Sequence, residues 1–348
     1  MITVDILSPV GGLHGGVENV IKSWIEHFDK RKFKLRVVHM TPGIAYLKGY
    51  IHAYEFKGPK NRQDMGYYVQ TYGEFILVHG APDICVATNW PLMSAVADVV
   101  RKRLAVEYKI VSWVHSRIEK YSEAGLGGVA HLMYADAHLA INNHIRDKIL
   151  EGNSTAKVYV IGNPVKLVDC EDRANEASHV LAYVGRIDEM KRLDIILEAM
   201  YRAKSKWLLK IVGSGEFEEE AREIVRYLKL DESVEFTGWQ ENPWKNLNDA
   251  VALVMASEYE GFALSAVEAL SAGKMVISTP VDGIIDYIVP GVNGYFYKQE
   301  DAIGLAEILD MIASNKLPVC SCKACRASVI KYSEDNYYAG LEKILKNL

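Results

Sequence analysis

The chain has 348 residues, of which 49% are hydrophobic and 24% are charged, and its net charge is −5. This length favours two domains of ordinary size, and the composition excludes disordered and fibrous classes of protein. No apolar run is long enough to span a membrane, and the N-terminus lacks a secretory signal, so a cytoplasmic location is expected. The five cysteines, an odd number, are expected to be thiols in a reducing compartment.

Short apolar runs alternate with amphipathic helical patterns along the whole chain. In the first half the runs lie at residues 2–7, 35–40, 84–87, 109–115, 137–142 and 158–161. In the second half they lie at residues 180–184, 208–212, 234–236, 252–256, 275–278 and 294–297. Strands that are apolar on both faces are typical of parallel sheets covered by helices. The sequence therefore predicts an α/β protein with two parallel sheets, joined near residues 164–178, and a last helix at residues 332–348.

Two glycine-rich segments follow predicted strands. The first ends at Gly15 and Gly16, where a helix begins, and the unpaired N–H groups of a helix start can bind phosphate. Its spacing differs from GxGxxG and lacks the lysine of a P-loop, which disfavours NAD and ATP, while a tight turn explains it equally well. The second contains Gly213 and Gly215. The glutamates that follow it would repel a phosphate, so a structural turn is the better interpretation.

Two cations lie after the strand predicted at residues 180–184. Gly185 and Arg186 follow the strand directly, and Lys191 comes five residues later, where a helix begins. Ligands of open parallel sheets bind outside the carboxyl ends of the strands. An arginine fork and a lysine point charge at this position suit a diphosphate, although a solvated surface pair remains an alternative.

The segment 258–270 is the most specific signal. Glu260 precedes a glycine turn, and Glu268 lies two turns along the following predicted helix. This spacing predicts both carboxylates on one side of the helix, with the N–H groups of Phe262, Ala263 and Leu264 between them. Carboxylates can accept hydrogen bonds from sugar hydroxyls, and a helix start stabilises a departing nucleoside diphosphate. Two solvated glutamates are the alternative.

Taken in order, these motifs resemble the retaining glycosyltransferases of the GT-B fold that form family 4. The resemblance covers almost the whole chain and is densest at residues 183–297. Within the family, the chain most resembles the bacterial lipopolysaccharide galactosyl- and hexosyltransferases. The residues that carry this likeness are 112–115, 134–136 and 238–244. It implies two Rossmann-like domains facing each other across a cleft.

The resemblance also implies domain roles. Residues 1–165 would bind the acceptor, which suits the net positive charge of this half. Residues 166–331 would bind the nucleotide sugar, and the helix 332–348 would pack back on the N-terminal domain.

Site residues are carried over by the same resemblance. Arg186 and Lys191 would hold the diphosphate, Glu260 the hydroxyls of the donor sugar, and Glu268 the ribose. Gly16 would let the backbone approach the phosphate. His115, at the end of a strand, would lie beside the donor sugar, although a histidine satisfied by the backbone is an alternative. The expected catalytic residues are Glu260, His115, Arg186 and Lys191. The expected donor-binding residues are Gly15, Gly16, Arg186, Lys191, Gly238, Trp239, Gln240, Phe262, Ala263, Leu264 and Glu268.

No cofactor or catalytic metal is expected. No convincing DxD-type pair ends a strand, so cations and a helix start would take the place of a metal. Cys320, Cys322 and Cys325 have ligand-like spacing but no fourth ligand nearby, which favours a loop over a zinc site.

The sequence thus predicts transfer of a hexose, galactose or glucose, from a UDP-sugar to a glycan or lipid-linked acceptor of the cell envelope. A peripheral contact with the inner membrane face is compatible with this function, and no nucleic acid is expected as a partner. Two alternatives stay open. One is a catalytically silent GT-B partner subunit, and the other is a nucleotide-sugar epimerase or phosphorylase of the same architecture.

Overall fold

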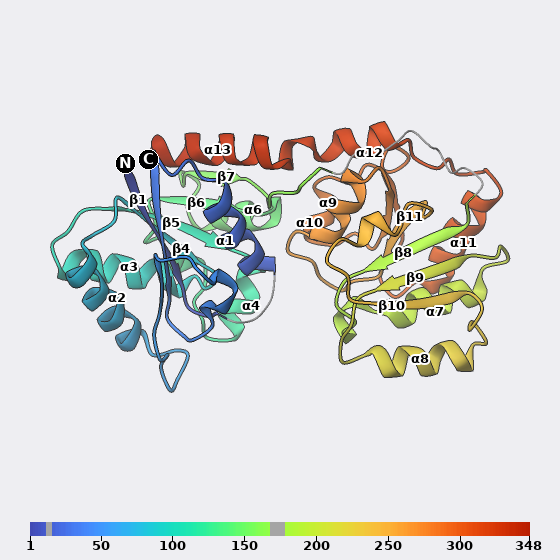
Figure 1. Cartoon of the computed structure of the whole chain (residues 1–348), viewed down its shortest axis with the longest axis horizontal. Coiled ribbons are helices and arrows are strands. Elements are labelled where there is room, and N and C mark those ends of the chain that lie inside the picture. The colour runs from blue at the N-terminus through green and yellow to red at the C-terminus, as the bar shows by residue number, and fades with distance from the viewer. Residues whose placement is uncertain (12–15, 168–177) are drawn as a thin grey trace. The chain divides into compact units, whose positions relative to one another are not determined.

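The protein is described by a computed structural model that covers residues 1–11, 16–167 and 178–348. The chain divides into two compact units, one formed by Met1–Pro164 with Glu334–Leu348 and the other by Val165–Ser333. Each unit contains a parallel sheet flanked by helices (Figure 1). The predicted α/β class with two parallel sheets is therefore confirmed. Most of the predicted linker lies outside the described residues.

In the described part of the first unit, the sheet has seven strands in the order β3-β2-β1-β4-β5-β6-β7, and every pairing is parallel. The strands are β1 (Ile2–Ser8), β2 (Phe33–His39), β3 (Ala53–Glu55), β4 (Ile84–Thr88), β5 (Lys109–Val114), β6 (Ala137–Ala140) and β7 (Val158–Val160). The three-residue edge strand β3 was not predicted, because its partly exposed residues lack an apolar run. The chain order reverses between β1 and β4, so the loops after these strands diverge at the carboxyl edge.

Helices cover both faces of this sheet. The helical segments of the unit's first 164 residues are α1 (Gly16–His27), η1 (Ile44–Leu47), α2 (Met65–His79), α3 (Leu92–Arg103), α4 (Ile118–Glu123), α5 (Val129–Leu132) and α6 (Asn143–Gly152). Helices α2 and α3 pack on one face, where Tyr72 and Met93 join the same buried cluster as Leu7 of β1. On the other face, Trp24 of α1 stacks on Trp113 of β5 with ring centroids 4.3 Å apart.

A buried ion pair ties β1, β2 and α2 together. The guanidinium of Arg36 donates to both carboxylate oxygens of Asp5, at 2.5 and 2.9 Å, and also to the carbonyls of His79 and Gly80. The hydroxyl of Tyr72 donates to Asp5 at 2.9 Å. Each buried polar group of the pair is thus satisfied, as burial of charge requires.

In the second unit, the described residues form a parallel sheet of six strands in the order β10-β9-β8-β11-β12-β13. The strands are β8 (Val180–Val184), β9 (Leu208–Val212), β10 (Val234–Gly238), β11 (Ala252–Met255), β12 (Met275–Ser278) and β13 (Gly294–Phe296). The chain order reverses between the neighbouring strands β8 and β11. Loops that leave such neighbours in opposite directions open a crevice at the carboxyl edge.

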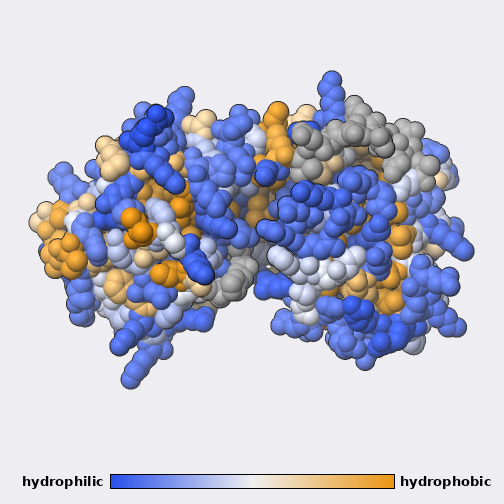
Figure 2. Space-filling view, in the orientation of Figure 1, coloured by the Kyte–Doolittle hydropathy of each residue, from blue (hydrophilic) through white to orange (hydrophobic). Residues whose placement is uncertain are grey.

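Helices also flank the second sheet (Figure 1). The helical segments of this unit are η2 (Glu189–Lys191), α7 (Leu193–Arg202), α8 (Glu218–Tyr227), η3 (Pro243–Lys245), α9 (Leu264–Ser271), α10 (Asp282–Ile285), α11 (Ala302–Ala313), α12 (Cys322–Val329) and η4 (Ile330–Tyr332). Their apolar faces are buried, as Ile196 of α7 and Leu270 of α9 show. Hydrophilic side chains cover most of the surface visible in Figure 2, with smaller hydrophobic areas between them.

The last helix, α13 (Glu334–Lys346), belongs to the first unit. The hydroxyl of Tyr337 accepts a hydrogen bond from Trp24 Nε1 at 3.2 Å, and Leu341 and Leu345 are fully buried. At the boundary of the second unit, the N–H of Val165 donates to the carbonyl of Tyr332 at 2.7 Å. The segments by which the chain enters and leaves the second unit are therefore adjacent.

Candidate functional site

The loop after β8 presents Arg186 at the carboxyl edge of the second sheet. Its Nε lies 3.0 Å from Asp188 Oδ2, and 76% of its side chain is exposed. Its carbonyl accepts a hydrogen bond of 2.6 Å from the hydroxyl of Tyr183, on β8. The backbone is thereby anchored to the strand, while the guanidinium remains accessible to an anion.

Lys191 and Glu260 form an ion pair at the point where β8 and β11 diverge. Lys191 Nζ lies 2.6 Å from Glu260 Oε1, and the hydroxyl of Ser257 donates to the same oxygen at 2.7 Å. Glu260 is only 8% exposed. The sequence assigned these two residues to different parts of a ligand, and the structure brings them into direct contact. A ligand group that binds to one of these side chains will therefore also lie close to the charge of the other.

The glycine turn after Glu260 leads into the N-terminus of α9. Ala263 adopts a left-handed conformation, with φ 56°, and the helix begins at Leu264. The hydroxyl of Tyr287 donates to the carbonyls of Phe262 and Ala263, at 2.9 and 3.3 Å. Within the described residues, no carbonyl accepts a hydrogen bond from the N–H groups of Phe262, Ala263 or Leu264. Such a helix start stabilises an anion.

Glu268 lies further along α9. The indole N–H of the buried Trp244, in η3, donates to Glu268 Oε2 at 3.4 Å. Burial raises the pKa of the Glu268 carboxyl, because the charged form is poorly solvated there. This carboxyl has thus lost part of its hydration and is held by one indole group, which distinguishes it from a freely solvated glutamate.

The residues predicted to face a base lie at the end of β10, which Gly238 terminates, and directly after it. Gly238 has φ 71°, a conformation that favours glycine, and its carbonyl accepts from the N–H of Gly213 at 3.0 Å. Trp239 is 73% exposed, and the side chain of Gln240 accepts a hydrogen bond from Asn246 at 2.9 Å. An exposed indole beside the carboxyl edge is available for stacking.

Gly213 and Gly215 pack backbone against backbone with the loop of Arg186. A Cβ atom on Gly213 would lie 1.8 Å from the carbonyl oxygen of Gly185, and one on Gly215 would lie 2.1 Å from that of Ile187. The N–H of Ile187 also donates to the carbonyl of Ser214 at 3.0 Å. These contacts support the structural interpretation of the glycines.

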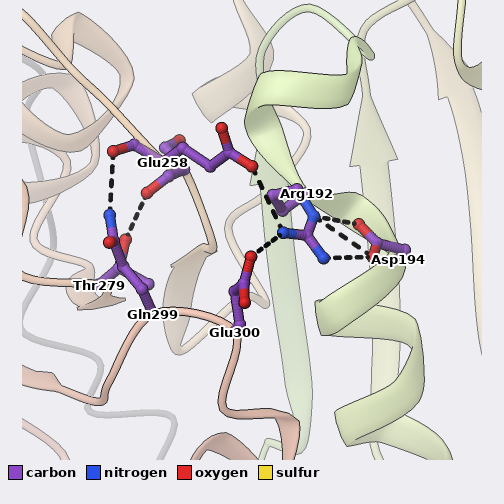
Figure 3. A network of polar contacts seen from close by, with 7 residues as sticks. Arg192, Asp194, Glu258, Thr279, Gln299 and Glu300 are labelled. Atoms are coloured by element: carbon purple, nitrogen blue, oxygen red, sulfur yellow. Dashed lines mark hydrogen bonds and ion pairs between the residues drawn. The ribbon is translucent and has the colours of Figure 1, made fainter.

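Sequence reasoning missed Arg192, which follows Lys191 directly. Figure 3 shows its guanidinium facing three carboxylates: Asp194 at 2.9 Å, Glu300 at 2.9 Å and Glu258 at 3.4 Å. Only the contact with Asp194 is local in sequence. A basic residue two positions before an acidic one is too common a pattern to indicate such a network.

Of the residues predicted in the first unit, His115 lies just after β5. Its Nε2 is 3.1 Å from the hydroxyl oxygen of Thr88, and its ring centroid is 4.1 Å from that of Trp113. Burial lowers the pKa of His115 to about 3, so the imidazole is neutral at physiological pH. Gly16 is the first residue of α1. Gly15 lies outside the described residues.

The cysteine prediction requires one correction. Cys85, Cys320 and Cys325 are buried free thiols, whereas Cys322 is disulfide-bonded. The prediction of a thiol at Cys322 is therefore wrong. It failed because cysteine number and spacing do not show which sulfur atoms are close in space.

Two features are absent from the described residues 1–11, 16–167 and 178–348. No group of three or more His, Cys, Asp or Glu residues is arranged to hold a metal ion. No helix there combines the length and the apolar character needed to cross a membrane.

The geometry of the second unit can be compared with known proteins. Residues 171–333 match the family model described as "Glycosyl transferases group 1". The chain carries a group 1 glycosyltransferase domain. The matched residues include the Lys191–Glu260 pair, Arg186 and the start of α9.

Relatives extend this similarity to the first unit. The chain is 26% identical over 346 residues to lipopolysaccharide 1,6-galactosyltransferase of Escherichia coli strain K12, covering 95% of this chain and 94% of that protein. Among solved structures, it matches the apo form of the lipopolysaccharide outer core galactosyltransferase WaaB, with a TM-score of 0.85, 25% identity and full coverage of both chains.

Anabaena HepE in complex with UDP-glucose matches with a TM-score of 0.77 and 18% identity, again with full coverage of both chains. At this identity the likeness shows the fold alone. The predicted resemblance to glycosyltransferases of the GT-B fold is confirmed by these matches. The retaining mechanism and membership of family 4 stay predictions.

Proposed function

We propose that this glycosyltransferase transfers a hexose, galactose or glucose, from a UDP-sugar to a hydroxyl of a lipopolysaccharide or related glycolipid acceptor, with retention of configuration. The observation that carries the proposal is the Lys191–Glu260 pair beside the start of α9, within the matched domain. The relative from Escherichia coli is a lipopolysaccharide 1,6-galactosyltransferase, and the HepE neighbour was crystallised with UDP-glucose.

In this proposal the second unit binds the donor and the first unit binds the acceptor. The exposed guanidinium of Arg186 and the N–H groups at the start of α9 hold the diphosphate. The positive charge of Lys191 stabilises the negative charge that develops on the β-phosphate as the bond between the sugar and the phosphate oxygen breaks. Because the backbone that carries Arg186 is anchored to β8 before reaction, little reorganisation is needed in the transition state.

Glu260 accepts hydrogen bonds from hydroxyls of the donor sugar. Its Oε1 already accepts from Lys191 and Ser257, so Oε2 is the atom proposed to face the sugar. Glu268 accepts from the ribose, and Gly238, Trp239 and Gln240 contact the base. We retain His115 as a contact of the donor sugar, since its neutral imidazole can donate or accept one hydrogen bond.

The chemical step is proposed as a front-face displacement. The bond between the sugar and the diphosphate breaks, the acceptor oxygen forms the new bond on the same face, and the departing phosphate takes the acceptor proton. Atoms and charge balance, because UDP leaves as the protonated product of the same step. No side chain of this chain is assigned as general base.

The test combines binding and turnover. Purified protein is screened by thermal shift with UDP, GDP, UDP-galactose and UDP-glucose, because a ligand that binds only the folded state raises its stability. Turnover is then followed as UDP release with and without a lipopolysaccharide core acceptor that lacks its galactose branch. Acceptor-dependent release and a product with an α linkage from an α donor support the proposal. UDP release that needs no acceptor indicates a hydrolase, and UDP release that needs inorganic phosphate indicates a phosphorylase. Conversion of one UDP-sugar into another without UDP release indicates an epimerase.

Two further expectations belong to this proposal. Turnover is expected to persist in a chelator, since cations and a helix start take the role of a metal, and complete loss restored by Mg²⁺ or Mn²⁺ would refute this point. A contact with the inner membrane face is checked by flotation with anionic vesicles. Absence of binding would remove the membrane from the proposal without affecting the transfer reaction.

A further inference from the structure

Arg192 connects three separate parts of the second unit. Its guanidinium contacts Asp194 at the start of α7, Glu258 in the loop after β11, and Glu300 in the loop after β13 (Figure 3). The contact with Asp194 is two-pronged, with Nε at 3.1 Å from Oδ1 and Nη2 at 2.9 Å from Oδ2. A planar guanidinium can bridge three carboxylates in this way, whereas an ammonium group on a flexible stem cannot hold the same geometry.

The backbone of Arg192 is strained. Its φ of 49° and ψ of 48° place it in the left-handed region, directly between Lys191 and the first residue of α7. A Cβ atom makes this conformation sterically unfavourable, whereas glycine adopts it freely. The conformation alone therefore does not explain an arginine here, and its side-chain contacts do.

Two routes lead from Arg192 to the Lys191–Glu260 pair. The first is covalent, since Lys191 is its neighbour in sequence. The second passes through the loop after β11, where the N–H of Glu258 donates to the carbonyl of Met190 at 3.0 Å. One residue before Glu258, the hydroxyl of Ser257 donates to Glu260 Oε1.

Two further side chains hold this loop from the other side. The amide of Gln299 donates to the carbonyl of Glu258 at 2.9 Å, and the hydroxyl of Thr279 donates to the carbonyl of Ser257 at 2.7 Å (Figure 3). Gln299 is the neighbour of Glu300, which Arg192 contacts. The Arg192 guanidinium thus lies where the loops after β8, β11 and β13 meet.

The charges around the Arg192 guanidinium explain why its removal would displace the neighbouring loops. One cation faces three carboxylates, so its removal would leave like charges close together and push Glu258 and Glu300 away from α7. The side chains of Glu258 and Glu300 are 52% and 70% exposed, so each ion pair adds little to the stability of the fold. A small displacement of the loop would nevertheless change the 2.6 Å contact between Lys191 and Glu260.

We propose that Arg192 is a positioning residue that sets the geometry of the Lys191–Glu260 pair and thereby the rate of sugar transfer. The proposal rests on the function proposed above for that pair. It assigns no direct contact between Arg192 and the donor. A misplacement of about 1 Å at a reacting centre can lower the rate by about 100-fold, which sets the scale of the expected effect.

The decisive variant is Arg192→Gly, because glycine keeps the left-handed turn without strain while the whole side chain, with its guanidinium, is removed. We expect kcat to fall by about 10- to 100-fold, with a change of only a few degrees in the midpoint of thermal unfolding. Arg192→Lys should recover little of kcat, because it keeps a charge but loses the fork. The matched control is Arg202→Ala, at the far end of helix α7, which begins directly after Arg192. Arg202 pairs with Glu198 at 2.6 Å on an exposed surface, and its loss should leave kcat unchanged.

A double-mutant cycle separates positioning from a general structural role. If Arg192 acts through Glu260, Arg192→Gly should lower kcat much less in a Glu260→Gln background than in the wild type. Equal fold-changes in both backgrounds, or a wild-type kcat for Arg192→Gly, would overturn the proposal.

A readout that needs no activity distinguishes this proposal from the function it rests on. In Arg192→Gly, amide hydrogen exchange of residues 256–263 should be faster, with Glu258 as the most affected amide, because its bond to Met190 spans the two loops. The Arg202→Ala control should exchange there as the wild type does. Unchanged exchange in Arg192→Gly would refute the positioning role. Faster exchange in a protein without transferase activity would retain the positioning role and reject the function.

Discussion

At the scale of single residues, Glu260 combines two tasks on one carboxylate. Oε1 accepts from Lys191 and Ser257, which holds the side chain in one orientation and leaves Oε2 for a ligand. A glutamine at this position would keep the shape but lose the negative charge that both Lys191 and a sugar hydroxyl are proposed to use. Replacement of Glu260 by glutamine therefore tests the role of the negative charge separately from the role of the side chain's shape.

We predict that Glu260→Gln lowers kcat by about one to two orders of magnitude at saturating donor and acceptor. The replaced contact is charge-assisted and worth roughly 1.5–3 kcal/mol, and about 1.4 kcal/mol corresponds to a factor of ten in rate. UDP affinity should not weaken, because the substitution leaves Lys191 free to face the diphosphate. Glu268→Gln is the companion variant and should raise the KM of the donor more than it lowers kcat. Full turnover by a folded Glu260→Gln protein would show that this carboxylate does not handle the transferred sugar.

His138 predicts how stability depends on pH. It lies in β6, almost fully buried, with its Nδ1 2.7 Å from the hydroxyl of Ser112, and burial lowers its pKa to about 4. In the unfolded chain the pKa is about 6.5, so the unfolded state binds more protons between these two values. His138 therefore lowers the free energy of unfolding as the pH falls from about 6.5 towards 4. Above about pH 6.5 its titration has no effect on this free energy.

We predict that His138→Gln removes part of this pH dependence. A shift of this size corresponds to a few kcal/mol, at about 1.4 kcal/mol per pKa unit. The free energy of unfolding of the wild type, measured by denaturant between pH 7 and pH 4, should fall more steeply than that of the variant. Parallel curves for the two proteins would mean that His138 binds its proton as readily in the folded state as in the unfolded state.

At the scale of elements, the turn after β9 supports the loop that carries Arg186. Gly215 lies so close to the backbone of Ile187 that any side chain would overlap it. By contrast, a Cβ atom on Gly340 in α13 would meet open space. The two glycines provide a matched pair, because one is required by a close approach and the other is not.

We predict that Gly215→Ala destabilises the fold by about 1–3 kcal/mol, as overpacking does, and raises the KM of the donor because the Arg186 loop must move. Gly340→Ala should instead stabilise the helix by about 0.5–1 kcal/mol, since alanine is the better helix former. Thermal unfolding and donor titration of both variants check this. A Gly215→Ala protein as stable as the wild type, with an unchanged KM, would contradict the close approach.

At the scale of the whole molecule, the chain completes its first unit only at its end. Helix α13 buries Tyr337, Tyr338, Leu341 and Leu345 in that unit, and the hydroxyl of Tyr338 donates to Ser23 Oγ at 2.6 Å. Residues 1–164 therefore lack part of their core until the last helix has been made. The stability of the first unit is coupled to a segment more than 150 residues away in sequence.

We predict that Leu341→Ala lowers the stability of the first unit by about 2–5 kcal/mol, the usual cost of a cavity left by leucine in a core. The second unit should keep its stability, because it contains none of α13. Hydrogen exchange resolved by unit measures the two separately, with the exposed Lys343→Ala as control. Equal loss of protection in both units would indicate that they unfold as one body.

The apolar runs were sufficient to predict both sheets and the position of Arg186, Lys191 and Glu260 after their strands, because strand and helix periodicity is local. Even so, β3 was missed, since its three residues, Ala-Tyr-Glu, form no apolar run. The Glu260–Glu268 motif also indicated its segment as a site, because a glycine turn followed by a helix start is visible in a short window.

Only the tertiary structure could show that Lys191 touches Glu260, that Gly215 packs against Ile187, and that Arg192 faces Glu258 and Glu300. These contacts join loops that follow different strands. Sequence spacing determines the distance between two residues only within one helix, strand or turn. Across a parallel sheet it is strand order that decides which loops meet, and β8 and β11 become neighbours although β9 and β10 separate them along the chain. The pairing of the two charges at the proposed site is a consequence of that order.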